Sequence, residues 1–322
     1  MAEWWIDEGI GEHRAALVAD DTIIEAAIDR LDDRLRVGAI VSAKLGERVG
    51  AGAWIATLLG DAILEAVPRG LSQGRPLLVE IVREALPEPG RLKPARARAS
   101  DATAERPAPT LAERLQGAPI RRLAVHEPDR LEQAGWSELI EQGLTGEIDF
   151  PGGALRLSPT PAMALFDVDG TLPVAELGVT GARAAAQAIR RLAIGGSIGI
   201  DLPTLGSKAD RAAAAAAIDA VLPQPFERTA VNGFGFIQIV RPRPHASIPE
   251  LVRADPALTA ALSLLHIASR SIGPRRLVAA PAVIARIEAR PDWIEALARR
   301  TGGSIGLRAD PALAISASHV EP

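Results

Sequence analysis

The chain has 322 residues, of which 48% are hydrophobic, 24% charged and 3% aromatic, with a formal net charge of −4. This length suggests about two domains of ordinary size, or several smaller ones. The sequence contains no cysteine, which excludes disulfides, thiolate zinc sites, iron–sulfur clusters and cysteine nucleophiles. Its mild acidity argues against coating of nucleic acid by bulk charge, although a local basic groove remains open.

Targeting signals are not expected. The first residues carry neither the basic nor the apolar segment of a secretory signal. The longest apolar stretch, residues 51–67, contains Asp61 and Glu65 and is too short to span a bilayer. A cytoplasmic protein without a membrane partner is therefore expected.

The first hundred residues predict short β-strands. Strands at 3–7, 13–18 and 22–28 are separated by the turn signals Gly9-Ile10-Gly11 and Asp20-Asp21. Further β-rich runs, separated by Gly or Pro, lie at 37–45, 51–58, 61–67 and 76–85. Their number and spacing suit an OB-type barrel. Residues 100–109 have no periodicity and predict a linker.

After the linker, strands alternate with helices, which indicates an α/β layer with right-handed crossovers. A hairpin is expected after Gly152-Gly153, and a capping-box-like start is expected at Ser207. The expected elements are a strand at 121–125, a helix at 128–142, hairpin strands at 154–158 and 162–166, a helix at 181–193, a strand at 197–200, a helix at 208–222, strands at 228–231 and 234–241, and a small helix–strand–helix–helix–strand unit from 249 onwards.

Two apolar strands end in aspartates. Residues 162–166 lead into Asp167-Val168-Asp169-Gly170, and residues 197–200 lead into Asp201. Ligands bind at the carboxyl ends of strands in α/β sheets, and Asp167 and Asp169 point to the same side of an extended chain, so three carboxylates could converge. These donors suit Mg²⁺ or Mn²⁺ together with a substrate phosphate. The alternative is that the acids simply lie in exposed turns.

These residues resemble motifs of two different protein families. Residues 165–172, Leu-Phe-Asp-Val-Asp-Gly-Thr-Leu, resemble the first motif of haloacid-dehalogenase-type phosphatases. That resemblance implies a nucleophilic Asp167 and a general acid at Asp169. The rest of the phosphatase pattern is missing, because no GDxxxD-type acidic pair follows and Lys208 is the only lysine downstream.

The second resemblance covers nearly the whole chain and is to the ribonuclease E/G family. Residues 152–169 resemble that family's hairpin and catalytic aspartate strand, with Asp169 in place of the usual Asn. Residues 190–201 resemble the helix, double glycine and strand that carry the second catalytic aspartate. Residues 234–243 resemble the strand that ends in two functional arginines. The start of the chain (12–18), a barrel with Trp54 where the family places an RNA-stacking aromatic, and the ending (299–311) follow in the family's order.

The resemblance implies an α/β (α+β) multidomain fold. Its expected parts are a first piece of a ribonuclease-H-like subdomain (1–32), an inserted S1/OB-type β-barrel (33–99), a linker in place of the family's 5′-sensor domain (100–115), the rest of the ribonuclease-H-like subdomain (116–148), a DNase-I-like catalytic core (149–245) and a small C-terminal α/β domain (246–322).

The resemblance also implies hydrolysis of single-stranded RNA, in RNA processing or decay, at a Mg²⁺ (or Mn²⁺) held by Asp167 and Asp201. Asp169 is a further candidate ligand, and Arg241 and Arg243 would clamp the scissile phosphate. The expected RNA-binding residues are Trp54, Lys93, Arg96 and Arg98. The corresponding structural interpretations are solvated charges for the arginines, a solvated tail for the basic run that starts at Arg91, and barrel core for Trp54.

Several features depart from the family pattern. The 5′-sensor domain is missing, and residues 242–249 replace the CxxC zinc link, so no structural zinc is expected and a homodimer would have to form without it. The five histidines are scattered and predict no metal pair. The competing functions are a non-catalytic RNA-binding protein of the same fold and, third, the phosphatase.

Overall fold

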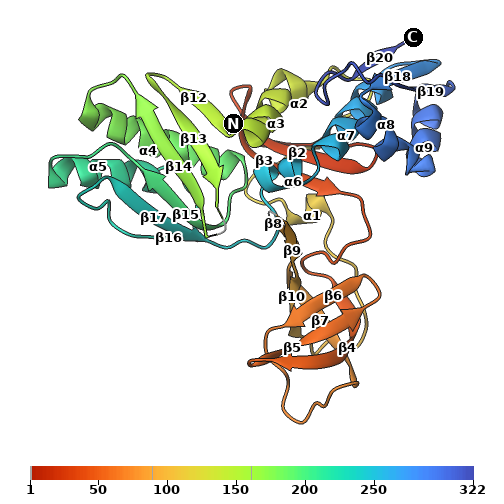
Figure 1. Cartoon of the computed structure of the whole chain (residues 1–322), viewed down its shortest axis with the longest axis horizontal. Coiled ribbons are helices and arrows are strands. Elements are labelled where there is room, and N and C mark those ends of the chain that lie inside the picture. Colours follow the sequence, from red (N-terminus) through yellow and green to blue (C-terminus); the bar gives the residue numbers. More distant parts are fainter. Residues whose placement is uncertain (1, 89, 161) are drawn as a thin grey trace. The chain divides into compact units, whose positions relative to one another are not determined.

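A computed structural model describes residues 2–88, 90–160 and 162–322 (Figure 1). The chain forms two compact units, each built from separate segments. The first unit comprises Met1–Asp32, Leu115–Ile140 and Val252–Pro322, and the second comprises Asp33–Arg114 and Glu141–Leu251. This division is coarser than the six segments that the sequence resemblance implies. The expected mixed α/β class is confirmed, including a closed five-stranded β-barrel.

A four-stranded sheet opens the first unit. In spatial order its strands are β11 (Ile120–Arg122), β1 (Glu3–Glu8), β2 (Glu12–Ala19) and β3 (Thr22–Arg30). The three expected N-terminal strands are confirmed to within two residues. Asp20 and Asp21 both have positive φ, as a two-residue hairpin turn that follows the twist of its strands requires.

The rest of the first unit is mainly helical, with a three-stranded sheet ordered β19-β18-β20. These elements are α2 (Arg130–Gln133), α3 (Trp136–Thr145), α6 (Ile248–Ala254), α7 (Pro256–Ser269), β18 (Arg275–Ala279), α8 (Pro281–Glu288), α9 (Pro291–Thr301), β19 (Ile305–Ala309) and β20 (His319–Glu321). The end of α3 and the start of α6 belong to the second unit. The single helix expected at 128–142 is broken, because Gly135 adopts φ +97° between α2 and α3. Ile10 packs with Leu265, Val283 and Trp293 in one core, so both ends of the chain share it.

The β-barrel belongs to the second unit and closes in the order β10-β6-β5-β4-β7. Its strands are β4 (Ile40–Val49), β5 (Gly52–Thr57), β6 (Gly60–Leu64), β7 (Pro76–Arg83) and β10 (Ala95–Ala99), with a side hairpin of β8 (Leu86–Glu88) and β9 (Arg91–Lys93), and α1 (Leu111–Arg114) follows. Alternating residues fill the barrel, including Ile55, Leu64 and Ile81, each at most 1% exposed. The 100–109 segment contains neither a helix nor a strand, as expected of a linker.

A six-stranded sheet forms the rest of the second unit, in the order β12-β13-β14-β15-β17-β16. The elements are β12 (Glu147–Phe150), β13 (Gly153–Pro159), β14 (Ala164–Gly170), α4 (Val174–Arg191), β15 (Gly196–Asp201), α5 (Lys208–Asp219), β16 (Glu227–Arg228) and β17 (Phe236–Arg241). The expected helix start is confirmed, since Ser207 Oγ accepts a hydrogen bond from the Asp210 N–H at 3.0 Å. Only β14 and β15, which α4 connects, run parallel; the other neighbouring strands are antiparallel.

The two faces of this sheet differ sharply. Phe166, Ile198 and Ile200 are fully buried on the side that α4 covers, and Gly181 lets that helix approach Val168 closely. Asp167 and Asp201 follow buried residues in these strands and are exposed on the opposite face. Helices on one face therefore leave the other open to a large ligand.

No single helix in the described ranges has the length and hydropathy needed to cross a membrane. The pair α6 and α7 meets that criterion by length and composition only when taken together, and the two helices bend by 102° at their junction.

Candidate functional site

Asp167 and Asp201 are direct neighbours on the six-stranded sheet. They are register partners in the parallel pair β14–β15, so their side chains leave the same face from backbones about 4.8 Å apart. Both residues are exposed. Asp201 ends β15, whereas Asp167 is the middle residue of β14, because that strand continues to Gly170. The adjacency expected from the sequence is therefore present, and two such carboxylates suffice for a Mg²⁺ that also binds a substrate phosphate.

A continuous row of side chains crosses the sheet through these two aspartates. Register pairing joins, from strand to strand, Glu147, Arg156, Asp167, Asp201 and Phe236. The guanidinium of Arg156 makes no ion pair or hydrogen bond with the described residues. A free arginine next to Asp167 can bind an anion that approaches the carboxylates. Sequence analysis placed Arg156 in the hairpin but gave it no role.

Asp169 is not gathered with the other two aspartates. It lies two residues further along β14, on the same face as Asp167, and is paired with Ala154. Within residues 2–88, 90–160 and 162–322, the group Asp167, Asp169 and Asp201 does not meet the spacing of a three-ligand metal cluster. The expected convergence of three carboxylates is therefore not observed.

Arg241 and Arg243 lie at the other end of the sheet. Strand β17 runs antiparallel to β15, so Arg241 is opposite Gly196 while Asp201 is opposite Phe236. Five strand residues, about 17 Å, separate the two ends. Arg241 donates a hydrogen bond to the Ile194 carbonyl at 3.2 Å, and Arg243 is paired with Glu250. A phosphate held at Asp167 and Asp201 would thus be beyond the reach of these arginines.

An exposed aromatic side chain lies close to Asp201 instead. Phe234, 83% exposed, occupies the turn before β17. The Asn232 side-chain oxygen accepts the N–H groups of Phe234 and Phe236 at 2.9 and 3.0 Å, and this fixes the turn. The turn is hydrogen-bonded to Leu202, the residue after Asp201. It therefore presents a base-sized aromatic surface near the carboxylates.

The barrel carries a second aromatic group on its outside. Trp54 is 38% exposed, whereas its neighbours Ala53 and Ile55 fill the interior. Register pairing places Trp54 beside Ile63, then Arg96, then Arg83. The interpretation of Trp54 as barrel core is wrong, and the outward position that RNA stacking requires is present.

Arg83 of this row lies close to other arginines and to two glutamates. Burial, followed by the charges of Arg96 and Arg243, lowers the pKa of Arg83, although Glu65 and Glu88 oppose this shift. The Arg83 guanidinium donates to the Pro94 carbonyl at 2.7 Å. Clustered guanidinium groups of this kind favour binding of a phosphate backbone.

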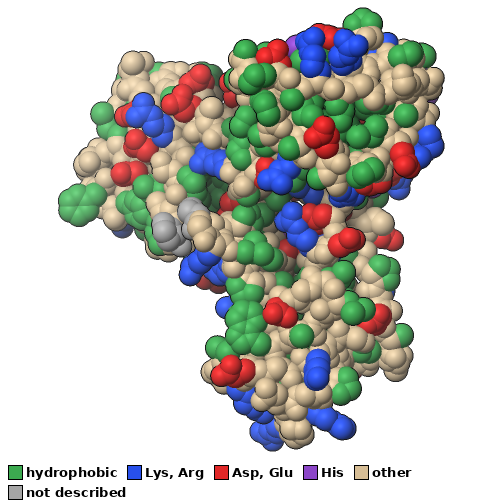
Figure 2. All heavy atoms as spheres, turned by 45° about the vertical axis from the view of Figure 1, so that its right-hand side comes forward, with side chains coloured by type: hydrophobic (Ala, Val, Ile, Leu, Met, Phe, Trp, Pro, Cys, Tyr) green, Lys and Arg blue, Asp and Glu red, His purple; other side chains and the backbone are tan. Residues whose placement is uncertain are grey.

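The basic run from Arg91 to Arg98 is largely neutralised by acids. Arg91 and Lys93 pair with Glu88, Arg96 pairs with Glu65 at 3.6 Å, and Arg98 pairs with Glu80 at 2.8 Å. On the face shown in Figure 2, the barrel carries charges of both signs, with Lys and Arg gathered at its lower end. Any RNA contact by Lys93, Arg96 or Arg98 must therefore compete with these surface ion pairs, which are individually weak.

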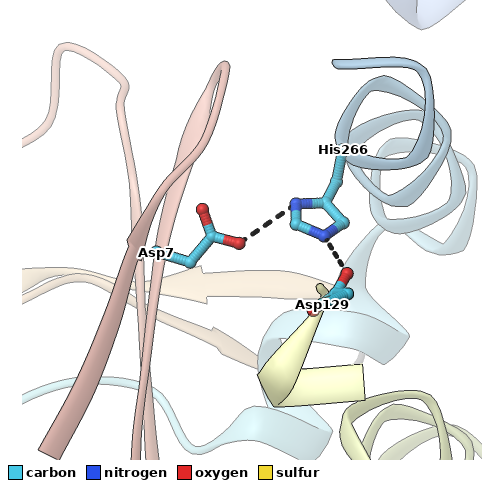
Figure 3. A group of neighbouring side chains, drawn as sticks. All are labelled: Asp7, Asp129 and His266. Carbon is cyan, nitrogen blue, oxygen red and sulfur yellow. Dashed lines mark hydrogen bonds and ion pairs between the residues drawn. The ribbon is translucent and has the colours of Figure 1, made fainter. Parts of the chain in front are cut away.

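A different group of ionisable residues lies inside the first unit (Figure 3). His266 of α7 stands between Asp7 of β1 and Asp129, the residue that caps α2. Nε2 of His266 lies 2.6 Å from Asp129 Oδ2, and Nδ1 lies 3.4 Å from Asp7 Oδ2. One ligand atom from each residue lies within 4.8 Å of the other two, so this group could hold a metal ion.

The carboxylate of Asp129 is strongly stabilised in its charged form. Burial raises its pKa, but hydrogen bonds from His266 and the Glu132 N–H, together with the charges of His266 and Arg270, lower that pKa to about 2. Asp7 is 5% exposed, and its Oδ2 is buried without a hydrogen-bond donor among the described residues.

Sequence analysis missed this group by treating His266 as an ordinary residue. The available signal was a histidine on an apolar helix, among Leu262, Leu264 and Leu265, because a buried imidazole needs polar partners. Its two partners are remote in sequence and could not be identified without the fold.

Neither a protein-family model nor any curated protein matches this chain.

Proposed function

We propose that the protein is a divalent-metal-dependent endoribonuclease that hydrolyses single-stranded RNA, of the type that the ribonuclease E/G resemblance implies. The observation that supports this most is the side-by-side placement of Asp167 and Asp201 on the open face of the sheet. The exposed face suits a polymer better than a small metabolite, which would need a closed pocket.

The donor set at Asp167 and Asp201 fits Mg²⁺. Two exposed carboxylates leave most of the ion's coordination sphere for water and phosphate oxygens, which is how Mg²⁺ is usually held. When bound, the ion would lower the pKa of a coordinated water and stabilise negative charge on the scissile phosphate. Mn²⁺ would fit the same oxygen donors.

The remaining residues of the site bind and orient the RNA. Arg156, next to Asp167, contributes a guanidinium that can hold two phosphate oxygens. Phe234 offers a stacking surface for an unpaired base near Asp201. Outside the barrel, Trp54 would hold a second base, with Arg83 and Arg96 along the same row.

The test is cleavage of a fluorogenic single-stranded RNA with Mg²⁺, comparing the wild type with Asp167→Asn and Asp201→Asn. Each variant keeps the side-chain shape but loses a metal-binding charge, so the rate should fall by more than about 100-fold. Asp149→Asn is the matched control, because Asp149 is an exposed aspartate on the same face, two strands from Asp167. Its rate should remain that of the wild type.

Two other outcomes would decide against the proposal. If the wild type binds the RNA but cuts it no faster than Asp167→Asn, the chain is a non-catalytic RNA-binding protein, the alternative that the exposed Trp54 favours. If Asp167→Asn abolishes turnover of a phosphomonoester and RNA stays intact, the phosphatase interpretation of residues 165–172 would replace it.

A further inference from the structure

The group Asp7, Asp129 and His266 lies in the first unit, whereas Asp167 and Asp201 belong to the second. We propose that this group is a second metal site, selective for Zn²⁺ over Mg²⁺, which ties together three separate segments of the first unit. The proposal is independent of the endoribonuclease function, since none of the three residues belongs to the sheet that carries Asp167.

The donor spacing supports a single bound ion. The three ligand atoms lie within 4.8 Å of one another. The ligands of a tetrahedral zinc ion lie about 3.4 Å apart, so small shifts of these side chains would bring all three onto one ion. Asp129 Oδ1 already accepts the Glu132 N–H at 3.1 Å, which leaves Oδ2 directed at His266. An ion bound at His266 Nε2 would replace the hydrogen bond between His266 and Asp129, and Asp7 would turn from Nδ1 towards the ion.

One carboxylate oxygen of Asp7 lacks a hydrogen-bond partner in this group. Asp129 contacts His266 and forms an ion pair with Arg270 at 3.8 Å. Asp7 Oδ2, in contrast, is buried and accepts no hydrogen bond from the described residues. A divalent ion would provide Asp7 with a partner.

The donor chemistry selects the kind of ion. Mg²⁺ and Ca²⁺ prefer oxygen ligands and retain water, whereas an imidazole nitrogen together with carboxylates suits Zn²⁺. The site is also largely closed, with Asp7 at 5% and His266 at 8% exposure. Closed zinc sites hold protein segments in place, since metal binding contributes directly to folding.

The ligands come from segments that are far apart in the chain. Asp7 belongs to β1, Asp129 precedes α2, and His266, 137 residues beyond Asp129, belongs to α7. A metal ion at this point would fasten the N-terminal sheet to the C-terminal helical part that shares its core. It would stabilise the first unit without cysteine.

The test is zinc binding by the full chain carrying Asp167→Asn and Asp201→Asn, which removes the other expected metal site. After dialysis against Zn²⁺, we expect one zinc per chain by elemental analysis, and Co²⁺ substitution should give the visible absorption of a low-coordinate site with oxygen and nitrogen ligands. Excess Mg²⁺ should not displace the zinc. In the same background, Asp129→Asn and His266→Gln should weaken zinc binding at least tenfold and abolish the rise in melting temperature that zinc produces.

His319→Gln is the matched control, because His319 is an exposed histidine in the same unit and should keep full zinc binding. Asp129→Asn keeps the test valid if Asp7→Asn fails to fold, since Asp129 is the more exposed of the two aspartates. Unchanged zinc stoichiometry in both the Asp129 and His266 variants would overturn the proposal. The proposal would also be overturned if the chain stays free of zinc at saturating Zn²⁺ and nitrogen NMR shows that both ring nitrogens of His266 are protonated. A proton, and not a metal ion, would then hold the group together.

Discussion

Arg156 of β13 and Asp167 of β14 lie directly opposite each other on the exposed face of the six-stranded sheet. Neither side chain has an ion-pair or hydrogen-bond partner among the described residues. A cross-strand pair of opposite charges left unbonded in this way is available to a ligand that carries both a metal ion and an anion. A phosphodiester bound with Mg²⁺ is such a ligand.

Replacement of Arg156 by Ala is therefore expected to impair RNA cleavage. A charge-assisted hydrogen bond to phosphate contributes about 2 kcal/mol, which corresponds to a loss of roughly 30-fold in kcat/KM. Arg183→Ala, at an exposed position of α4 on the covered side of the sheet, is the control and should cleave normally. Steady-state rates with a fluorogenic RNA provide the measurement, and equal activity of the two variants would refute a phosphate-binding role for Arg156.

Replacement of Trp54 by Ala is expected to weaken RNA binding without unfolding the barrel, because the indole lies outside the core. Stacking of a base on an aromatic side chain contributes about 1–3 kcal/mol, so the Kd for a short single strand should rise by about 5- to 150-fold. Trp54→Phe should retain most of the affinity, and Leu58→Ala, at a 98% exposed position of the same barrel, should retain all of it. Fluorescence anisotropy at fixed salt measures all three; a Trp54→Ala affinity equal to that of Leu58→Ala would exclude stacking at this position.

Gly181 keeps α4 close to the strand that carries Asp167. A Cβ at this position would lie 2.4 Å from Val168 Cγ1, well inside van der Waals contact. Alanine would gain about 1 kcal/mol in helix propensity, but overpacking costs about 1–3 kcal/mol, so we expect Gly181→Ala to lower the free energy of unfolding. Gly206→Ala, where a Cβ meets nothing within 4 Å, is the control for urea denaturation. A Gly181→Ala midpoint at or above that of the wild type would show that the helix can move away freely.

The barrel, the strand–helix order and the adjacency of Asp167 and Asp201 could all be predicted from the sequence. Alternating apolar residues and Gly or Pro breaks determine the strands locally, and a single helix between two strands, here α4, nearly always makes them parallel neighbours. Both aspartates then lie at the same edge of the sheet. For this part of the site, the local residue pattern and the right-handedness of strand–helix–strand crossovers were sufficient for the prediction.

The position of Arg241 could not be predicted in the same way. Continued α/β alternation would have placed the end of β17 at the edge that carries Asp201. Instead, α5 leads into β16, and the chain then turns back, so that β17 runs antiparallel to both β16 and β15. The partner of Asp167 depends equally on pairing register, which the sequence of the β13–β14 hairpin does not determine. The contact of His266 with Asp7 depends on the packing of distant segments, and no local pattern encodes it.

Asp219 and Arg228 provide a pH-dependent link between α5 and β16. The side-chain hydrogen bonds of Arg228, one of them 2.7 Å long, are the main reason why the pKa of Asp219 is lowered. A carboxyl whose folded pKa is depressed stabilises the fold above its ordinary pKa, and this stabilisation is lost as the pH falls through the lowered value. NMR titration should show the depressed pKa in the wild type and a return towards the ordinary value in Arg228→Gln, with Arg228→Lys between the two. The same low pKa in Arg228→Gln would mean that another group holds the charge. Because Asp219 is nearly half exposed, the accompanying change in stability should be small.

A substitution of Phe234 can separate RNA binding from RNA cleavage. Its side chain is almost fully exposed, yet its turn is held by Asn232 and by a close approach of Gly235, at φ +94°, to the backbone of Leu202. An exposed aromatic residue on a well-fixed turn beside Asp201 is suited to hold a base, but it has no group that could move a proton. We therefore expect Phe234→Ala to raise KM for single-stranded RNA about tenfold while kcat changes little, and Phe234→Trp to restore KM. Ile272→Ala, at an equally exposed apolar position in the first unit, is the control. If Phe234→Ala instead lowers kcat at unchanged KM, the turn positions Asp201 rather than the RNA, since its hydrogen bond to Leu202 is the remaining connection to the carboxylates.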